Sequence, residues 1–293
     1  MKRKIWMALC CLLPLMAFDN RPLPEVFLIG DSISMYYGPY LQKYLAGSYT
    51  LLRKEDNGHA ADNLDIPTGA NGGDSHMVLQ YLQIKERDPA FRPDILLLNC
   101  GLHDIKRDPV TKKIQVDSSS YRRNLEAIYD ITRKLGIRLV WINTTPVDDE
   151  RHNSRSKSFY RYAADVAAYN AIAGEVWRAH KVPQIDLFGF TTNIGAAAHY
   201  IDHVHYDEAA RALQAAFICG NLRAFTSTAG SGAAAGPVIP FRLAGKIKPR
   251  NATAITASNW SIGGETLDRD YADYNHYKQY LGPLGAKRVR LEG

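Results

Sequence analysis

The sequence predicts an α/β fold in which helices cover both faces of a parallel sheet. Short apolar runs alternate with longer amphipathic segments through residues 24–222. Such runs are typical of strands buried on both faces, and their alternation with helices is typical of parallel sheets. The clearest run, Asp94–Cys100, reads DILLLNC and carries a charge only at its first position.

The individual elements follow from this alternation in chain order. The predicted strands are Val26–Ile29, Thr50–Arg53, Asp94–Cys100, Ile137–Asn143 and Val182–Leu187. The predicted helices are Tyr36–Leu45, Ser75–Arg87, Tyr121–Leu135 and Phe159–His180. The helix at 121–135 shows the pattern best, because Leu125, Ile128 and Leu135 fall on one stripe and Gly136 is a typical stop.

The composition is that of an ordinary globular protein. The 293-residue chain is 46% hydrophobic and 23% charged, which argues against wholesale disorder. Its formal charge of +6 falls to +3 (6 − 3) without Lys2, Arg3 and Lys4. No basic stripe interleaved with aromatic residues follows in the sequence, so no nucleic-acid partner is predicted.

The first twenty residues have the pattern of a secretory signal. A basic start precedes an apolar run from Ile5 to Phe18, which is too short to span a bilayer comfortably. We therefore predict a signal peptide at 1–20, a secreted or periplasmic protein and no stable membrane span. A lipid anchor at Cys10 or Cys11 is the weaker alternative, because the residues before them are not small.

The C-terminal part differs in composition from the rest. Residues 224–250 are rich in small residues and are predicted to form a linker. Residues 251–293 regain a strand–helix–strand pattern, but a piece of this size is too small to fold alone. We predict the opening of a second domain there, with a small appendage packed on the first domain as the alternative. In the first domain, Cys100 is expected to be a buried thiol rather than half of a disulfide.

Ser32 lies where the first predicted strand ends. The sequence VFLIGDSIS passes from an apolar run through the turn residues Gly30 and Asp31 to a helix start. A serine in that place has its hydroxyl at the carboxyl edge of the sheet, next to backbone N–H groups and the positive end of a helix. Taken alone, the position suits a nucleophile and a helix cap equally.

Two other strand ends carry unusual polar residues. The motif NCGLHD follows the strongest strand and places His103 at the same sheet edge. After the last strand, Asp202 and His205 are three residues apart, so one turn brings the carboxylate beneath the imidazole. A carboxylate on one ring nitrogen leaves the other free to take a proton from a hydroxyl, which makes Ser32, His205 and Asp202 a candidate triad.

A metal site is the alternative for the histidines of this last segment. His199, His203 and His205 are close in sequence, but their spacing matches none of the His-rich signatures of zinc hydrolases. We therefore predict neither a metal nor an organic cofactor.

A pair of glycines precedes the helix predicted at 75–87. In the motif NGGDS, Gly72 and Gly73 expose backbone N–H groups at a helix start, which suits the binding of an oxyanion. A flexible loop with a helix cap is the plainer interpretation of this motif taken alone.

Together these motifs resemble those of the SGNH, or GDSL, hydrolase superfamily over roughly residues 24–222. The GDS that ends in Ser32 matches the first block, Gly73 the glycine of the second, and Asp202 and His205 the acid and base of the fifth. The resemblance implies a three-layer α/β/α flavodoxin-like fold with a parallel sheet. It also implies a serine nucleophile, whose own N–H and that of Gly73 form part of an oxyanion hole.

His103 departs from the family pattern. The family usually has Gly-x-Asn-Asp where this chain has GLHD, and the Asn donates an amide N–H to the oxyanion. A neutral imidazole also donates one hydrogen bond, so His103 is the third predicted oxyanion donor. Protonation of its ring would make the hole sensitive to pH, and a weaker hole would lower activity.

Residues 258–291 resemble the start of a glycosidase-type (β/α)₈ barrel, and this attachment favours a carbohydrate substrate. The sequence thus predicts a secreted serine esterase that removes small acyl groups, acetyl above all, from carbohydrates or from another small ester. Two alternatives remain: a non-catalytic carbohydrate-binding protein on the same fold, and a glycan O-acyltransferase.

Overall fold

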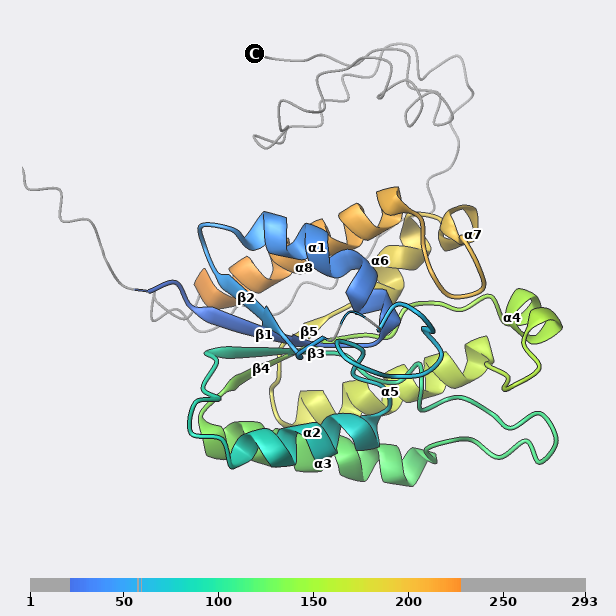
Figure 1. Ribbon diagram of the computed structural model, residues 1–293, viewed down its shortest axis with the longest axis horizontal. Coiled ribbons are helices and arrows are strands. Elements are labelled where there is room, and N and C mark those ends of the chain that lie inside the picture. The colour runs from blue at the N-terminus through green and yellow to red at the C-terminus, as the bar shows by residue number, and fades with distance from the viewer. Residues whose placement is uncertain (1–21, 57, 59, 228–293) are drawn as a thin grey trace, which may run out of the picture. The chain divides into compact units, whose positions relative to one another are not determined.

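A parallel sheet forms the middle of the protein (Figure 1). The computed structural model describes residues 22–56, 58 and 60–227, and within them the sheet has five strands. The strands are β1 (Glu25–Ile29), β2 (Thr50–Arg53), β3 (Ile95–Leu98), β4 (Arg138–Ile142) and β5 (Gln184–Ile185). They lie in the order β2-β1-β3-β4-β5 and all pair in parallel, so their carboxyl ends share one edge.

Helices cover both faces of this sheet. They are α1 (Ser32–Leu45), α2 (Ser75–Glu86), α3 (Ser118–Leu135), α4 (Asp149–Arg155), α5 (Ala163–Ala179), α6 (Leu187–Asn193), α7 (Ala196–His199) and α8 (Glu208–Ser227). In Figure 1, α1, α6 and α8 lie on one face, and α2, α3 and α5 lie on the other. α1 packs against α8, and α3 packs against both α2 and α5. The three-layer α/β/α fold predicted from the sequence is therefore confirmed.

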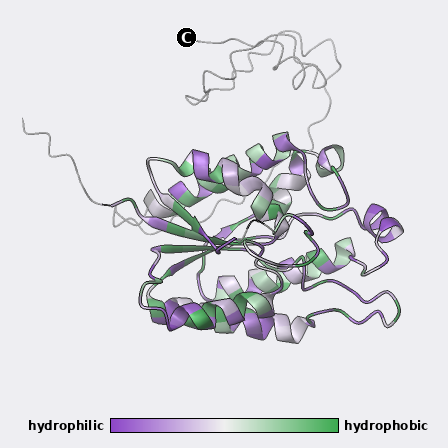
Figure 2. Cartoon of the chain, viewed as in Figure 1, coloured by the Kyte–Doolittle hydropathy of each residue, from purple (hydrophilic) through white to green (hydrophobic). Residues whose placement is uncertain are grey.

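The strands hold the centre of the hydrophobic core. All of β3 and residues 26–29 of β1 are buried, because helices cover the sheet on both sides. Trp141 of β4 and Trp177 of α5 are fully buried, with ring centroids 5.1 Å apart. Figure 2 shows hydrophobic strands between helices that carry both hydrophobic and hydrophilic residues. This core fixes the ends of β1 and β3, from which two of the candidate site segments start.

Most predicted elements are confirmed, with differences at their ends. β3 and β4 lie inside their predicted ranges, and β2 coincides with its range. The first helix begins at Ser32 rather than at Tyr36, because the Asp31 carboxylate accepts a hydrogen bond from the Ile33 N–H (2.9 Å) and caps the helix there. Asp117 likewise caps α3, because its side chain accepts a hydrogen bond from the Ser120 N–H.

In the C-terminal half of the domain, one predicted helix starts later than expected and another helix was not predicted. The helix expected from Phe159 begins only at Ala163, because Arg107 and Tyr160 exchange two backbone hydrogen bonds of 2.8 Å that keep the preceding segment extended. α8 was not predicted, since its many alanines leave only a weak apolar stripe. It continues to Ser227 and so occupies the start of the stretch predicted as a linker, 224–250.

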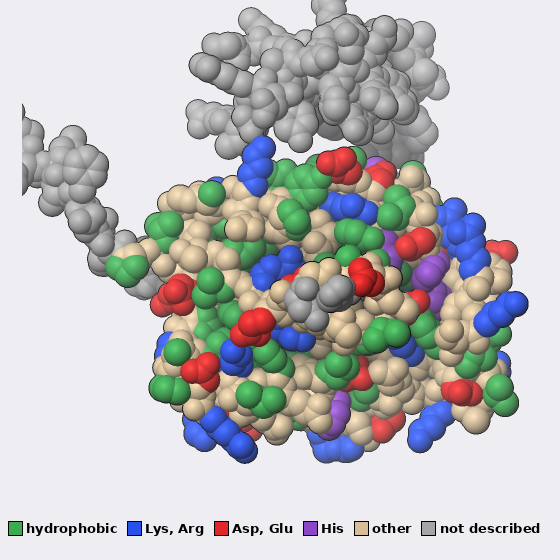
Figure 3. All heavy atoms as spheres, in the orientation of Figure 1, with side chains coloured by type: hydrophobic (Ala, Val, Ile, Leu, Met, Phe, Trp, Pro, Cys, Tyr) green, Lys and Arg blue, Asp and Glu red, His purple; other side chains and the backbone are tan. Residues whose placement is uncertain are grey.

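The predictions for both ends of the chain lie outside the described residues. These are the signal peptide at 1–20, the rest of the linker, and the partial second domain at 251–293. Within the described part, no helix is long and apolar enough to cross a membrane. Cys100 and Cys219 are buried free thiols there, as expected for Cys100. On the face seen in Figure 3, acidic and basic side chains are interspersed.

Candidate active site

Ser32 occupies the first position of α1, directly after the end of β1. Asp31 caps the helix, so the Ser32 side chain is left for another partner. The turn is tight, because a Cβ on Gly30 would come within 2.6 Å of the Ser34 side chain. Ser32 is only 2% exposed and lies at the positive end of the helix. The serine therefore stands at the sheet edge where the sequence placed it.

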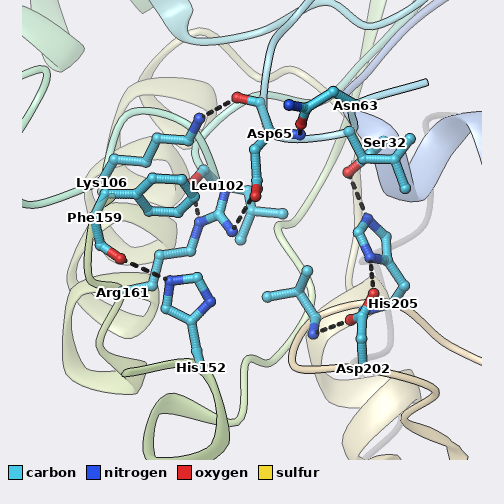
Figure 4. Close-up of polar contacts among 12 residues, drawn as sticks. Ser32, Asn63, Asp65, Leu102, Lys106, His152, Phe159, Arg161, Asp202 and His205 are labelled. Atoms are coloured by element: carbon cyan, nitrogen blue, oxygen red, sulfur yellow. Dashed lines mark hydrogen bonds and ion pairs between the residues drawn. The ribbon is translucent and has the colours of Figure 1, made fainter. Parts of the chain in front are cut away.

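His205 connects Ser32 to Asp202 (Figure 4). Its Nε2 lies 2.9 Å from the Ser32 Oγ, and its Nδ1 lies 2.5 Å from Asp202 Oδ2. The other carboxylate oxygen, Asp202 Oδ1, accepts the backbone N–H groups of Val204 and His205, each at 2.8 Å. The three predicted residues thus form one continuous line of hydrogen bonds from hydroxyl to carboxylate.

A tight loop between α7 and α8 brings Asp202 and His205 together. The loop is closed by the Ile201 N–H, which donates to the His205 carbonyl (2.9 Å), and by a bridge between Tyr200 and Tyr206. Arg151 of α4 holds it from outside through a hydrogen bond to the Asp202 carbonyl (2.8 Å). Asp202 and His205, which are three residues apart, are therefore brought together by a loop and not by a helical turn.

The environment of the loop keeps Asp202 ionised. Burial raises the pKa of this carboxyl, but the hydrogen bond and charge of His205 and the two backbone N–H donors outweigh burial, so the pKa lies well below its ordinary value. The His205 ring packs edge-on against Tyr36, with centroids 5.1 Å apart. The hydrogen bond to Asp202 and the packing against Tyr36 together orient the imidazole toward Ser32.

Gly73 lies at the start of α2 in a left-handed backbone conformation, with φ of +75°. Its N–H donates to the Asn71 side-chain oxygen (3.0 Å). Asp74 caps α2 by accepting from the Met77 N–H (2.9 Å). The helix thus begins where the sequence predicts, but the two glycine N–H groups are not exposed. The Gly72 N–H donates to the Gly30 carbonyl (2.8 Å), and the Gly73 N–H that was expected in an oxyanion hole is hydrogen-bonded within its own loop.

His103 is fully buried in the segment that follows β3. Neither of its ring nitrogens has a hydrogen-bond partner among the described residues. Burial lowers the pKa of the ring well below its ordinary value, and the positive charges of Lys106 and Arg161 lower it further. His103 is therefore a neutral imidazole with one N–H to donate.

The other histidines of this segment make different contacts. His199 Nδ1 lies 2.9 Å from Asp207 Oδ2, and the His203 ring packs on His152 with centroids 4.2 Å apart. In the described part of the chain, no three His, Cys, Asp or Glu side chains are grouped so as to hold a metal ion. The absence of a cofactor stays a prediction.

A second group of charged residues near the Ser32–His205–Asp202 hydrogen bonds was not predicted from the sequence. Arg161 is 1% exposed and lies between α4 and α5, while Lys106 follows His103 and Asp65 belongs to the loop before α2. The signal available in the sequence was an arginine flanked by Phe159, Tyr160 and Tyr162. An arginine in such an aromatic segment is a candidate for burial, but its partners are far away in the sequence.

Comparison with known proteins gives the class of this chain. Residues 28–213 match the model of the GDSL-like lipase/acylhydrolase family. The match covers more than half of the 293 residues, so the chain belongs to this family of ester hydrolases. No match was found among curated proteins.

Solved structures are similar to this chain in fold. A lipase/acylhydrolase from Enterococcus faecalis aligns with a TM-score of 0.51 and 18% identity, over 69% of this chain and 96% of its own. A GDSL-like lipase from Bacteroides thetaiotaomicron aligns with a TM-score of 0.49 and 14% identity, over 68% of this chain and 87% of its own. The acetyl xylan esterase AlAXEase aligns with a TM-score of 0.49 and 17% identity, over 67% of this chain and 98% of its own. The alignment with the Enterococcus faecalis protein shows a shared SGNH hydrolase fold.

Proposed function

We propose that this protein is a secreted serine esterase that removes small acyl groups, acetyl above all, from carbohydrates. The observation that carries the proposal is the line of hydrogen bonds from the Ser32 hydroxyl through His205 to Asp202. Membership in a family of lipases and acylhydrolases supports ester hydrolysis as the reaction class.

In the proposed mechanism, the Ser32 Oγ attacks the ester carbonyl while His205 Nε2 takes the hydroxyl proton. His205 then gives that proton to the leaving alcohol, and a water molecule hydrolyses the acyl-serine by the same steps in reverse. The ionised Asp202 accepts the Nδ1–H of His205, which fixes the tautomer and stabilises the imidazolium.

The oxyanion of the tetrahedral intermediate needs hydrogen-bond donors at the same place. In the proposal these are the N–H groups of Ser32 and Gly73 and the neutral ring of His103. His103 fits the role because its buried ring is neutral and unpartnered among the described residues. Gly73 fits it if its N–H exchanges the Asn71 side-chain oxygen for the oxyanion.

A short acyl group and a carbohydrate alcohol are the substrate we favour. Ser32 is 2% and His205 is 4% exposed, so the reacting atoms are largely shielded from solvent. The carbohydrate half of the proposal, and secretion, rest on the sequence patterns of the two chain ends.

The test is hydrolysis of 4-nitrophenyl acetate and of an acetylated oligosaccharide by the wild type and by Ser32→Ala. We expect kcat to fall by about 10³-fold or more in the variant, because the nucleophile is lost. Ser154→Ala is the matched control, since Ser154 is exposed on α4 and its hydroxyl donates to the Arg151 carbonyl. Hydrolysis unchanged by Ser32→Ala would overturn the mechanism, and glycan binding without turnover would favour a carbohydrate-binding protein. Product analysis with an acceptor sugar separates hydrolysis from acyl transfer.

A further inference from the structure

Arg161 is a buried cation whose hydrogen-bonding capacity is only partly used. Its side chain is 1% exposed, and its Nε donates to the Leu102 carbonyl (3.0 Å). Its Nη1 has no hydrogen-bond partner among the described residues. Burial lowers the pKa of the guanidinium to about 10, so it stays charged at neutral pH. A buried arginine with a purely structural role usually has its N–H groups satisfied.

This guanidinium belongs to the surroundings of the candidate triad. It interacts electrostatically with Asp31 and Asp202, and the Leu102 carbonyl that it binds immediately precedes His103. Figure 4 shows Arg161 and the Ser32–His205–Asp202 line on two sides of the same region. A substrate bound at Ser32 therefore lies within the electrostatic reach of Arg161, as Asp31 and Asp202 do.

The place in front of Arg161 is occupied by the Asp65 carboxylate. Asp65 Oδ1 lies 3.7 Å from Arg161 Nη1, which is an ion pair but too long for a hydrogen bond. The Asp65 side chain is 43% exposed, so the position of its carboxylate is open to solvent although Arg161 is not. Lys106 holds this loop in place through a hydrogen bond from its Nζ to the Asp65 carbonyl (2.6 Å).

Arg161 and Lys106 are the cations at this place, and the carboxylates of Asp65, Asp31 and Asp202 all raise the pKa of Arg161. A replacement for Asp65 with better hydrogen-bond geometry would be held more tightly by this guanidinium. The planar fork of a guanidinium matches a carboxylate with two hydrogen bonds, a geometry that Asp65 does not reach.

We propose that Arg161 binds the carboxylate of an acidic sugar, a uronic acid that carries the ester, in the place that the Asp65 carboxylate occupies here. This inference rests on the proposed function and narrows its substrate class. Binding exchanges one long internal ion pair for a bidentate contact, and Asp65 moves out into the solvent that it already touches.

The test compares two ligands that differ only in the carboxylate at C6, an acetylated methyl glucuronoside and the corresponding acetylated methyl glucoside. Their dissociation constants are measured by calorimetry on the full-length Ser32→Ala protein, so that binding is read without turnover. We expect the uronoside to bind about tenfold more tightly, as a charge-assisted contact would give. Equal dissociation constants would overturn the inference. Turnover is assayed separately: if the wild type hydrolyses neither sugar nor 4-nitrophenyl acetate, the proposed function fails, whatever the binding result.

Two variants in the Ser32→Ala background test whether Arg161 and Asp65 cause the preference for the uronoside. Arg161→Met is expected to reduce the binding ratio to about one, with Arg122→Met, at an exposed ion pair of α3, as the matched control that keeps it. Asp65→Asn removes the internal competitor from a partly exposed position and is expected to tighten uronoside binding severalfold, with Asp130→Asn as its exposed control. If Arg161→Met does not fold, Asp65→Asn decides: unchanged or weaker uronoside binding contradicts the inference.

Discussion

At the scale of single residues, His103 is the group that distinguishes this site from the family pattern. Its ring is fully buried, and burial together with the charges of Lys106 and Arg161 holds its pKa well below the ordinary value. The ring is therefore neutral at neutral pH and keeps one N–H. The pH sensitivity that the sequence led us to expect from its protonation is moved to more acidic conditions.

We expect His103→Ala to lower kcat for 4-nitrophenyl acetate by about 10²-fold with little change in KM, because an oxyanion donor acts mainly in the transition state. His103→Asn should restore most of the activity, since an amide N–H takes the same place. Steady-state kinetics of the three proteins at neutral pH measure this. An unchanged kcat in His103→Ala would remove His103 from the oxyanion hole.

At the scale of elements, Asp104 ties the start of α2 to the segment after β3. Both of its carboxylate oxygens lie 3.0 Å from the Ser75 N–H, and the residue is fully buried. Burial raises the pKa of this carboxyl to about 7, although the hydrogen bonds from Ser75 act in the opposite direction. This buried carboxyl therefore connects the segments that carry Gly73 and His103.

This carboxyl makes stability depend on pH. The folded protein keeps the Asp104 proton up to about pH 7, whereas the unfolded chain loses it near pH 4. The contribution of this group to the stability of the folded protein is therefore complete below about pH 4 and is lost as the pH rises to 7. Asp104→Asn has no proton to lose. We expect its free energy of unfolding, relative to the wild type, to rise by up to roughly 4 kcal/mol between these pH values. Urea unfolding at pH 4, 5.5, 7 and 8.5 measures it, and a pH-independent difference would contradict the assignment.

The sequence predicted elements well where burial is uniform or periodic. β3 is a continuous apolar run, and α3 carries a clear apolar stripe that ends at Gly136. The start of α5 was missed because a tertiary contact, between Arg107 and Tyr160, keeps the chain extended where local sequence favours helix. α8 was missed because an alanine-rich helix buries one face without a strong pattern.

At the scale of the whole molecule, the site joins segments that are far apart in the chain. Ser32 follows β1, and Asp202 and His205 precede α8, yet the parallel sheet brings both to one edge. The triad could be predicted because strand ends in such a sheet meet at a known place. The pairing of Arg161 with Asp65 could not, because it depends on how two irregular loops fold over that edge.

The most direct measurement of the central claim is covalent labelling of the intact protein with a serine-reactive phosphonate ester, located by peptide mass spectrometry. The hydrogen bond from Ser32 to His205 predicts one adduct per chain, on Ser32. The adduct should disappear in His205→Ala and persist in His199→Ala, whose histidine is paired with Asp207 instead. Labelling of another residue, or no labelling of a folded protein that still hydrolyses 4-nitrophenyl acetate, would contradict Ser32 as the nucleophile.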